Sequence, residues 1–460
     1  MPHVSDVFVV GAGITGLTIA YELASRGRSV TVLESSSRAG GLIRTERDGG
    51  FTIEAGPDAL LASKPAGLEL VRELGLEADL QSVQTPGAFV LRGTRLYRLP
   101  SPSLLGLPVT GRALAGYDLL PWPARLRLAI EPRVPRRESA EDESVASFFR
   151  RRFGPETVDL IAQPLLGGIH AGDIEQLSMQ SLFPRLLDLE RTQGHVLPKK
   201  VAVTFFGEKR GQPGVSPFVS LRGGMSALVD AVMRALPPGT VQFDAPVARV
   251  TPVTGGWHLS AKGASHLAAA VVLAAPAHAV APLLRPIDPE VADLCAQVPY
   301  VSTASVALAW PRPAIAHPLD GTGFVVARKH SDVRITAATW VSSKWAARAP
   351  DETVLIRAFL GGQHDPGAVD LGDDDLVAVV RRDLQSVMGI TAAPALARVF
   401  RWRHAGAQHT VGHLQRVQRI EQRLAAIGGI FVAGSGFRSV GIPDCIADAR
   451  RVAAAITQRE

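Results

Sequence analysis

Three glycines and one acidic residue near the start of the chain have the types and spacing to bind a dinucleotide. Gly11, Gly13 and Gly16 follow the apolar run VFVV and open a helical pattern, and Glu34 closes SVTVLE eighteen residues after Gly16. In such a motif the glycines make a tight turn, let the backbone approach a pyrophosphate and let helix pack on strand. The helix start offers N–H groups to phosphates, and Glu34 is placed to accept hydrogen bonds from a ribose. A strand–turn–helix unit that binds nothing is the alternative.

A second glycine turn indicates which dinucleotide binds. Arg38, Gly40 and Gly41 lie in ESSSRAGGLIRT, directly after Glu34. This R-x-G-G stretch resembles the pyrophosphate-contacting segment of FAD enzymes in the superfamily of amine oxidases and porphyrinogen oxidases. An arginine there supplies charge and donors to a phosphate, and the glycines keep the chain close to the cofactor. The resemblance implies FAD rather than a nicotinamide cofactor.

The bulk properties of the chain predict a folded protein of two or three lobes. It has 460 residues, of which 46% are hydrophobic and 20% charged. The 49 Lys and Arg exceed the 43 Asp and Glu, a modest excess that suits an acidic substrate or an anionic membrane. No helix-turn-helix, RNP or zinc pattern is present, so we expect no nucleic-acid partner. Cys295 and Cys445 form no C-x-x-C pair, which predicts no metal site and a reducing, cytoplasmic compartment.

Two segments bear on membrane contact. The apolar stretch 266–284 is interrupted by Pro276 and Pro282, so its VVLAAP part is predicted to be a buried strand rather than a membrane span. The first predicted strand begins almost at once, which leaves no room for a signal peptide. Residues 100–137 mix prolines, large apolar residues and arginines. This composition fits either an ordinary loop-and-helix excursion or a surface peripheral to the inner face of the cell membrane. In the second case leucines and Trp122 would lie in the interface, and the arginines would contact lipid phosphates.

The remaining periodicity predicts the elements that position these residues. Residues 140–195 are predicted to be helical, with Arg150–Arg152 on a solvated face. Alternating apolar residues between 300 and 360 predict an antiparallel sheet, and FVLRGTRLYRLP predicts a hairpin. The C-terminal GGIFVAGSGFRSVGIPDCIADARRVAAAI again has the pattern of strand, glycine turn and helix. A second such unit so far from the first predicts a nucleotide domain built from discontinuous segments.

Seven stretches spread over nearly the whole chain resemble one family. They are GAGITGL, EAGPDALLASKP, LLGGIHAGDIEQLSM, SLRGGMSALVDA, SSKWAARAP, QHTVGHL and VAGSGFRSVGIPDCI. In order and spacing they are similar to the oxygen-dependent protoporphyrinogen and coproporphyrinogen III oxidases, bacterial FAD enzymes of heme biosynthesis within the amine oxidase-like superfamily. The resemblance implies an α/β fold, with a Rossmann-like FAD-binding domain of discontinuous segments, an α+β substrate domain and a mostly helical membrane-associated domain. The implied segments are 1–62, 215–284 and 396–460 for FAD, 63–84 and 285–395 for substrate, and 85–214 for the helical domain.

The same resemblance assigns the cofactor contacts position by position. The implied FAD-binding residues are Gly11, Ala12, Gly13, Ile14, Thr15, Gly16, Glu34, Ser35, Arg38, Gly40, Gly41, Gly56, Pro57, Asp58, Ala59, Val247, Trp402, Val440, Gly441 and Ile442. Val247 would lie on a strand beside the adenine. The amides at 440–442 would open the last helix toward the pyrimidine end of the isoalloxazine. A core aromatic is the alternative interpretation of Trp402.

Substrate contacts follow from the family in the same way. The implied residues are Gly168, His170, Val325, Trp345, Arg92 and Arg95. GGIHAGD would line the wall between the helical domain and the flavin, while Val325 and Trp345 would form an apolar clamp on the tetrapyrrole. Arginine suits the propionates of such a substrate. Plain sheet core is the favoured interpretation of Val325 and an alternative for Trp345.

The implied reaction is the six-electron oxidation of a porphyrinogen to a porphyrin. Three two-electron rounds would each pass a hydride to flavin N5 and electrons to molecular oxygen, releasing hydrogen peroxide. Pyrrole protons can leave by tautomerisation, so no dedicated catalytic residue is expected. Protoporphyrinogen IX and coproporphyrinogen III both stay open as substrates, and oxygen and a respiratory quinone both stay open as the physiological oxidant. The alternatives are another amine oxidase-like flavin oxidase or desaturase, and a flavin- or tetrapyrrole-binding protein without turnover.

The chain also departs from the family at three positions. Ala88 stands where some relatives have a basic residue, and Phe437 and Ser439 stand where tyrosine and glycine are common. Arg92, Arg95 or Arg98 would then take over a propionate, or the propionates would face solvent. The resemblance further implies a homodimer and hand-over of the product to a ferrochelatase.

Overall fold

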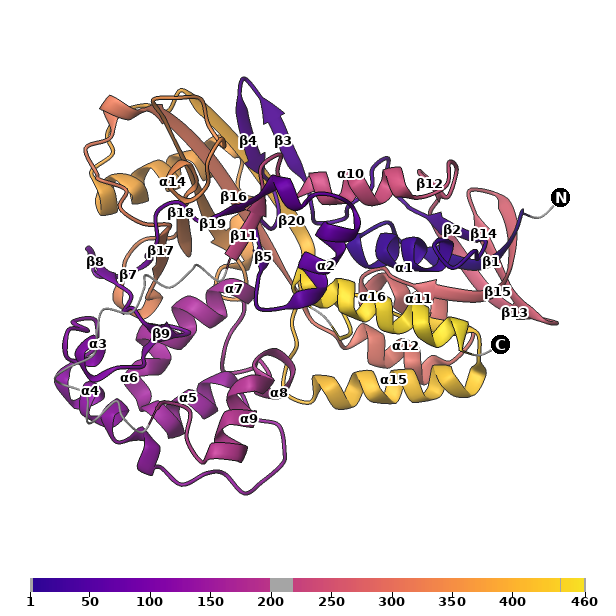
Figure 1. Ribbon diagram of the computed structural model, residues 1–460, viewed down its shortest axis with the longest axis horizontal. Helices are drawn as coiled ribbons and strands as arrows, with labels where there is room; N and C mark the ends of the chain where they lie inside the picture. The colour runs from indigo at the N-terminus through magenta and orange to yellow at the C-terminus, as the bar shows by residue number, and fades with distance from the viewer. Residues whose placement is uncertain (1–2, 199–217, 439, 459–460) are drawn as a thin grey trace.

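The computed structural model describes residues 3–198, 218–438 and 440–458. The predictions for Ser439 and for the end of the helical segment, 199–214, therefore lie outside the described residues. Two large sheets and a helical lobe make up the described chain, and the two termini lie at the same end of the molecule, beside the first sheet (Figure 1).

The first sheet is assembled from three distant stretches of the chain. Its strand order within the described residues is β12-β2-β1-β15-β14-β13, and β21 pairs with β15. The strands are β1 (His3–Val10), β2 (Val30–Leu33), β12 (Val241–Gln242), β13 (Val247–Val253), β14 (Gly256–Ala261), β15 (Ala264–Leu273) and β21 (Ile430–Val432). Pairing is parallel except between β13, β14 and β15. The discontinuous construction expected from the second strand–turn–helix unit is present.

The central strand β1 is buried on both faces, which explains its uninterrupted apolar run. Val7 and Val9 pack into the core on one side of the sheet. Phe8 and Val10 pack into a separate core on the other side. A parallel sheet covered on both faces produces such runs in place of alternation.

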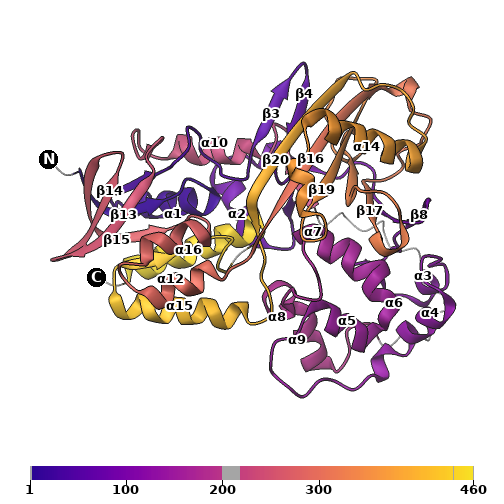
Figure 2. The same cartoon turned by 180° about the vertical axis from the view of Figure 1, so that it is seen from behind.

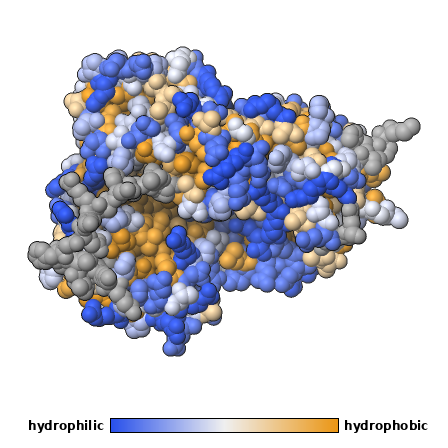
Figure 3. Space-filling model, viewed as in Figure 1, coloured by the Kyte–Doolittle hydropathy of each residue, from blue (hydrophilic) through white to orange (hydrophobic). Residues whose placement is uncertain are grey.

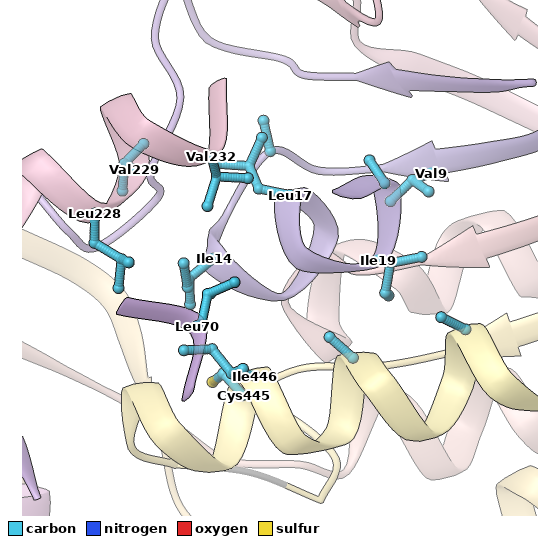
Figure 4. Close-up of a cluster of buried hydrophobic side chains, with 14 of the residues drawn as sticks. Val9, Ile14, Leu17, Ile19, Leu70, Leu228, Val229, Val232, Cys445 and Ile446 are labelled. Atoms are coloured by element: carbon cyan, nitrogen blue, oxygen red, sulfur yellow. The ribbon is translucent and has the colours of Figure 1, made fainter. Parts of the chain in front are cut away.

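Helices cover both faces of the first sheet and complete the two cores. One face is covered by α1 (Ile14–Ala24), α2 (Pro65–Glu73), α10 (Ser226–Ala235) and α16 (Ile442–Thr457), and the other by α11 (Ala277–Leu284), α12 (Pro289–Ala296) and α15 (His413–Ile427). Figure 4 shows Ile14, Leu70, Val229 and Ile446 meeting from four different helices. The start of α1 therefore packs against α10 and α16, which come more than two hundred residues later in the sequence.

The second sheet has the strand order β20-β16-β19-β18-β17-β7-β8. Its strands are β7 (Phe89–Arg92), β8 (Arg95–Arg98), β16 (Tyr300–Pro311), β17 (Gly323–Val326), β18 (Ala337–Trp340), β19 (Thr353–Gly361) and β20 (Leu396–Ala407). The expected antiparallel pairing between 300 and 360 is confirmed, and so is the β7–β8 hairpin, which joins the sheet in parallel beside β17. Figure 2 shows α14 (Asp373–Met388) lying against this sheet.

The helical lobe spans residues 111–193 and lies beside the second sheet. It contains α3 (Gly111–Ala115), α4 (Trp122–Ala129), α5 (Val145–Phe153), α6 (Pro155–Thr157), the π-helix η3 (Val158–Gly167), α7 (Gly168–His170), α8 (Met179–Leu182) and α9 (Pro184–Gln193). Three mutually contacting aromatics, Phe148, Phe149 and Phe153, lie in its core. Figure 3 shows apolar side chains around a hollow between this lobe and the second sheet.

The prediction of a solvated face for Arg150–Arg152 is wrong for two of the three residues. Arg152 is fully buried and paired with Glu131, and Arg151 pairs with Glu143 and Glu190. Only Arg150 is exposed. Burying guanidinium groups is costly unless carboxylates compensate them. Here the acidic partners come from three other segments, the short 3-10 helix at Glu131, the loop at Glu143 and α9 at Glu190, which local periodicity does not reveal.

The apolar stretch 266–284 forms the end of β15 and the helix α11, so the strand prediction for VVLAAP is confirmed. Among the described helices, none has the length and apolar character needed to cross a membrane.

Candidate functional site

The glycine-rich turn after β1 is packed too closely for side chains at two of its three glycines. Gly11 has φ +105°, and a Cβ on it would lie 2.9 Å from the carbonyl oxygen of Ala274 in the strand β15 segment. A Cβ on Gly16 would collide with the carbonyl oxygen of Gly11. These two glycines therefore fix the turn against β15 and seat α1 on the sheet, as the motif predicts.

Gly13 differs because the space above it is open. A Cβ there would meet no described atom within 4 Å. The second glycine turn lies beside it: Gly13 and Gly40 form a parallel bridge, and Gly40 N–H donates to the carbonyl of Ala12 at 2.8 Å. Gly41 follows with φ +58° and its Cβ position 3.3 Å from Gly13 Cα. We call Gly11–Gly16 with Gly40–Gly41 the glycine cradle.

The cradle also presents the start of a helix. Gly13 is the N-cap of α1 and supplies no side-chain cap, and Ile14, Thr15 and Gly16 form the buried first turn. Thr15 lies close to Gly434 from the distant C-terminal segment, 3.6 Å from its Cβ position. The uncapped N–H groups of such a turn suit a phosphate.

Glu34 is held in place at the end of β2 by the cradle itself. Its Oε2 accepts the N–H of Ala12 at 2.7 Å, and its Oε1 accepts the N–H and the hydroxyl of Ser36, both at 2.8 Å. The hydroxyl of exposed Ser35 lies 3.3 Å from the same Oε1. The backbone also turns back here, since Ala245 N–H donates to the carbonyl of Glu34 at 2.8 Å. That bond brings the half-buried Val247, the first residue of β13, to the same end of the sheet.

Arg38 folds back onto its own turn in the structure. Its guanidinium donates to the carbonyls of Ala39 and Ile43 at 3.2 Å each and to that of Gly41 at 2.6 Å. Burial lowers the pKa of Arg38, helped by the neighbouring Arg44. The positive charge thus stabilises the second glycine turn beside Gly13.

The 56–59 segment connects the cradle to the second sheet. A Cβ on Gly56 would collide with the carbonyl oxygen of Leu42, so the two turns are in direct contact. Asp58 accepts hydrogen bonds from Lys344 Nζ at 2.7 Å and from Trp345 Nε1 at 3.1 Å. Burial alone would raise the pKa of Asp58, but Lys344 and Arg357 hold it well below its usual range. Pro57 and Ala59, half-buried on either side, complete this segment.

Trp345 and Trp402 both donate from the indole to this segment. Trp345 is 1% exposed and bonded to Asp58, and Trp402 Nε1 donates to the carbonyl of Ala55 at 2.8 Å. Trp402 therefore anchors the backbone just before Gly56. Val325, on β17, is half-buried and packs against the core of the helical lobe.

The start of α16 carries the last predicted cofactor contacts. Gly441 is its N-cap and donates its N–H to the carboxylate of Asp444 at 3.3 Å. Asp444 is in turn paired with Lys64 at 2.6 Å. Ile442 is buried in the same core as Ile14, so α16 and α1 begin close together, and Val440 directly precedes this start. The third segment of the chain is thus brought to the cradle.

The turn after η3 joins the helical lobe to the second sheet. Gly168 is exposed with no described atom within 4 Å of its Cβ position, and Ile169 is 68% exposed. The carbonyl of His170 accepts from Gln408 at 2.9 Å. Burial lowers the pKa of His170 to about 4, so the imidazole is neutral at pH 7.

Two of the predicted substrate residues lie elsewhere. Arg92 and Arg95 face each other at the turn of the β7–β8 hairpin, on the outer edge of the second sheet (Figure 1). Arg92 donates to the carbonyl of Leu119 at 3.0 Å, and exposed Arg95 lies over the ring of Tyr97. The structure does not bring these two arginines to the turn that contains Gly168.

Sequence reasoning missed a group of buried charges beside Asp58. Arg357, in the middle of β19, donates to the carbonyl of Gly56 at 2.7 Å. Arg348 bonds Glu54 at 3.1 Å, and burial raises the pKa of Glu54 against the pull of that arginine. The available signal was a charged residue inside the otherwise apolar TVLIRAF. A charge at a buried strand position requires a specific partner, and here the partners are the backbone and carboxylates of the 54–58 segment.

These residues fit FAD on structural grounds. The open space at Gly13, the uncapped start of α1 and the nearby Arg38 suit a pyrophosphate, and the held carboxylate of Glu34 suits a ribose diol. The cradle lies at the carboxyl ends of parallel strands, where ligands bind in folds of this kind. Fold and site together define a flavin-dependent oxidoreductase.

Comparison with known proteins agrees with that class. The family model for flavin-containing amine oxidoreductases matches residues 14–457, and the chain belongs to this family. It is 34% identical to the coproporphyrinogen III oxidase of Bacillus subtilis over 450 residues, covering 96% of this chain and 95% of that protein. It is 31% identical to the coproporphyrinogen III oxidase of Staphylococcus aureus, with 96% of each chain covered.

Solved structures show the same relationship. A protein from Exiguobacterium sp. 255-15, provisionally called a protoporphyrinogen oxidase, superposes with a TM-score of 0.87 at 29% identity over 100% of both chains. Putrescine oxidase superposes with a TM-score of 0.71 at 18% identity, again over 100% of both chains, which shows a shared fold. The expectations of an α/β flavoprotein fold and of FAD as cofactor are confirmed.

Proposed function

We propose that this protein oxidises coproporphyrinogen III to coproporphyrin III with molecular oxygen as acceptor. The observation that carries the proposal is the near-complete match to proteins named coproporphyrinogen III oxidase, at 34% identity over 96% of the chain. Protoporphyrinogen IX is the second candidate, favoured by the name given to the Exiguobacterium structure. FAD would supply a two-electron acceptor for each of three rounds, which together remove six electrons and six protons from the substrate.

The chain's own residues would act by position and exclusion of water. The buried charges around Asp58 hold the 56–59 segment rigidly beside the cradle, through Lys344, Trp345 and Arg357. His170 is neutral, and its lowered pKa makes it a weak base. Substrate would enter the apolar hollow between the helical lobe and the second sheet (Figure 3). The site residues therefore position the substrate and exclude water, and the pyrrole nitrogens release their own protons without a catalytic base.

The test is porphyrin fluorescence over time with purified holoenzyme, oxygen and each porphyrinogen in parallel. A rise above the spontaneous rate, with matching peroxide, is expected, and it should be faster with coproporphyrinogen III. A faster rise with protoporphyrinogen IX would reverse the order of the two substrates. No rise with either, from protein with full FAD content, would favour the sibling-oxidase or the non-catalytic alternative.

We also propose that the helical lobe contacts a membrane surface through one face of α4. Trp122, Leu126 and Ile130 recur at helical spacing and are 72%, 54% and 42% exposed. Arg125 and Arg127 are turned inward, donating to the carbonyls of Leu120 and Arg151, so the apolar face rather than these arginines would make the contact. Such a face fits the interfacial region of a bilayer.

Vesicle binding tests this contact. The variant W122S/L126S/I130S should lose co-sedimentation with anionic vesicles, while Val253→Ser, an exposed apolar residue on the first sheet, should not change it. Equal binding by both variants would reject the contact. The homodimer and the hand-over of product to a ferrochelatase are proposed only from the family resemblance. They are tested by sedimentation and by following porphyrin transfer between the two purified proteins.

A further inference from the structure

A small pocket lies between the π-helix η3 and the second sheet. One wall is the small-residue turn after η3, including Gly168, Ala171 and Gly172. The opposite wall comes from Val326 at the end of β17, from Arg328 just after it, and from the end of β19 with the following His364. The turn is fixed against the sheet, since Gln363 N–H donates to the carbonyl of Ala171 at 2.8 Å. The walls are therefore held at a set separation.

Arg328 brings an uncompensated positive charge to this pocket. It begins the short 3-10 helix η6 (Arg328–His330), and its Nη1 is shielded from solvent with no acceptor among the described residues. Burial lowers the pKa of Arg328, although the nearby Asp365 opposes the change. A buried donor without an acceptor is unfavourable, and arginine is the side chain best shaped to take a carboxylate.

The carboxylates near Arg328 are already committed to other cations. Asp365 accepts two hydrogen bonds from Arg334, at 2.7 and 3.0 Å. Asp159, on η3, is paired with Lys329 at 2.8 Å. Among the described residues neither carboxylate is bonded directly to Arg328, which leaves its guanidinium available on the wall opposite Gly168.

We infer that Arg328 receives one side-chain carboxylate of the tetrapyrrole, in the pocket between η3 and the second sheet. The inference rests on the proposed function and assigns a binding residue to it. Two placements support it. Gly168 has no described atom within 4 Å of its Cβ position, which leaves space beside the pocket. Val325, which packs toward the helical lobe, lies three residues before Arg328 on the same segment. The pocket also explains how a chain with Ala88, and with Arg92 and Arg95 at the outer sheet edge, still meets an acidic substrate.

Binding of the product porphyrin to holoenzyme tests the inference without requiring turnover. The variants are Arg328→Gln, Arg328→Lys, and Lys329→Gln as a matched control for the loss of one neighbouring positive charge. Flavin absorbance and fluorescence quenching by coproporphyrin III and by its tetramethyl ester, in the same detergent, are the readouts. Arg328→Gln should weaken coproporphyrin III binding about ten- to a hundredfold, the range for a charged hydrogen bond, with flavin content unchanged. Arg328→Lys should restore part of the loss.

Each outcome separates the subsite from the proposed function. The ester has no charge to offer, so Arg328→Gln should leave its binding unchanged. Equal loss for acid and ester, or loss in Lys329→Gln as large as in Arg328→Gln, would mean a structural role and would overturn the inference. If the wild type oxidises porphyrinogen and the variant Arg328→Gln still binds coproporphyrin III normally, the subsite is overturned and the proposed function stands. Wild type that neither binds porphyrin nor oxidises porphyrinogen overturns both.

Discussion

The imidazoles of His409 and His413 stack inside the protein, with ring centroids 3.8 Å apart. They are 1% and 0% exposed, and burial lowers their pKa to about 4 and about 3. His409 Nε2 lies 2.9 Å from the carbonyl of Ser435, and His413 Nε2 lies 2.6 Å from that of Phe437. Because carbonyls only accept, both Nε2 atoms carry hydrogen. His409 Nδ1 is 2.8 Å from the hydroxyl of Ser181 on α8. The pair therefore connects the helical lobe to the loop before α16 in its neutral form.

This arrangement predicts a loss of stability in mild acid. In the unfolded chain each imidazole binds a proton with a pKa near 6.5, whereas in the folded protein both stay neutral down to about pH 5. The free energy of unfolding that depends on the neutral pair is therefore fully present above pH 6.5, and it decreases as the pH falls from 6.5 toward 4. Between pH 7 and pH 5, proton uptake by the unfolded state is worth about 2 kcal/mol for each histidine, or about 4 kcal/mol for the pair.

Urea unfolding of holoprotein at pH 7 and pH 5, followed by circular dichroism, measures this loss. The H409Q/H413Q variant keeps a donor near each carbonyl but cannot titrate, and His330→Gln removes an exposed histidine as the control. Wild type and control should each lose about 4 kcal/mol more than the double variant over this interval. If the double variant shows the same pH dependence as wild type, or if the control abolishes it, the buried neutral pair is not its origin.

Three further perturbations follow from the geometry. Gly13→Val should purify without flavin colour, because a side chain would fill the open space of the cradle, and a yellow protein would contradict the cofactor assignment. Arg348→Met should lower stability in chemical denaturation by about 3–5 kcal/mol, because it leaves Glu54 buried without its ionic partner. The exposed Arg72→Met should cost less than about 1 kcal/mol, and equal losses would refute this reasoning. Burial raises the pKa of Cys295 to about 12, so thiol reagents should label it only after denaturation, and rapid labelling of native protein would disprove the burial.

The cofactor end of the molecule could be predicted from sequence because local rules determine it. Gly11 and Gly16 are required by close backbone contact, and Glu34 by the geometry of a strand end, so spacing alone carries the information. The strands of both sheets follow from apolar runs and alternation in the same local way. A strand such as β1, which is buried on both faces, has a continuous apolar run, whereas a strand buried on one face has alternating apolar and polar residues.

The substrate side could not be predicted as well, because its contacts are made between distant segments. Arg92 and Arg95 had the right chemistry, yet their hairpin lies at the sheet edge. Arg328 has no unusual local sequence, and Arg357 stands out only as a charge inside the apolar TVLIRAF. The assembled fold is needed to show that Arg328 lines a pocket and that Arg357 supports Gly56. The burial of Arg152 likewise depends on an acidic residue from a separate turn.

The three-segment construction of the first sheet has a consequence for how the protein is made. β1 leaves the ribosome more than two hundred residues before its neighbour β15, and about four hundred residues before β21 and α16. The contact between Gly11 and Ala274 therefore cannot form until β15 and Ala274 have been made, and the packing of α16 on α1 follows later still, because contacts between distant residues wait until both segments exist. Flavin uptake becomes a late event in biogenesis, and a chain that terminates early would leave apolar β1 exposed to chaperones and proteases.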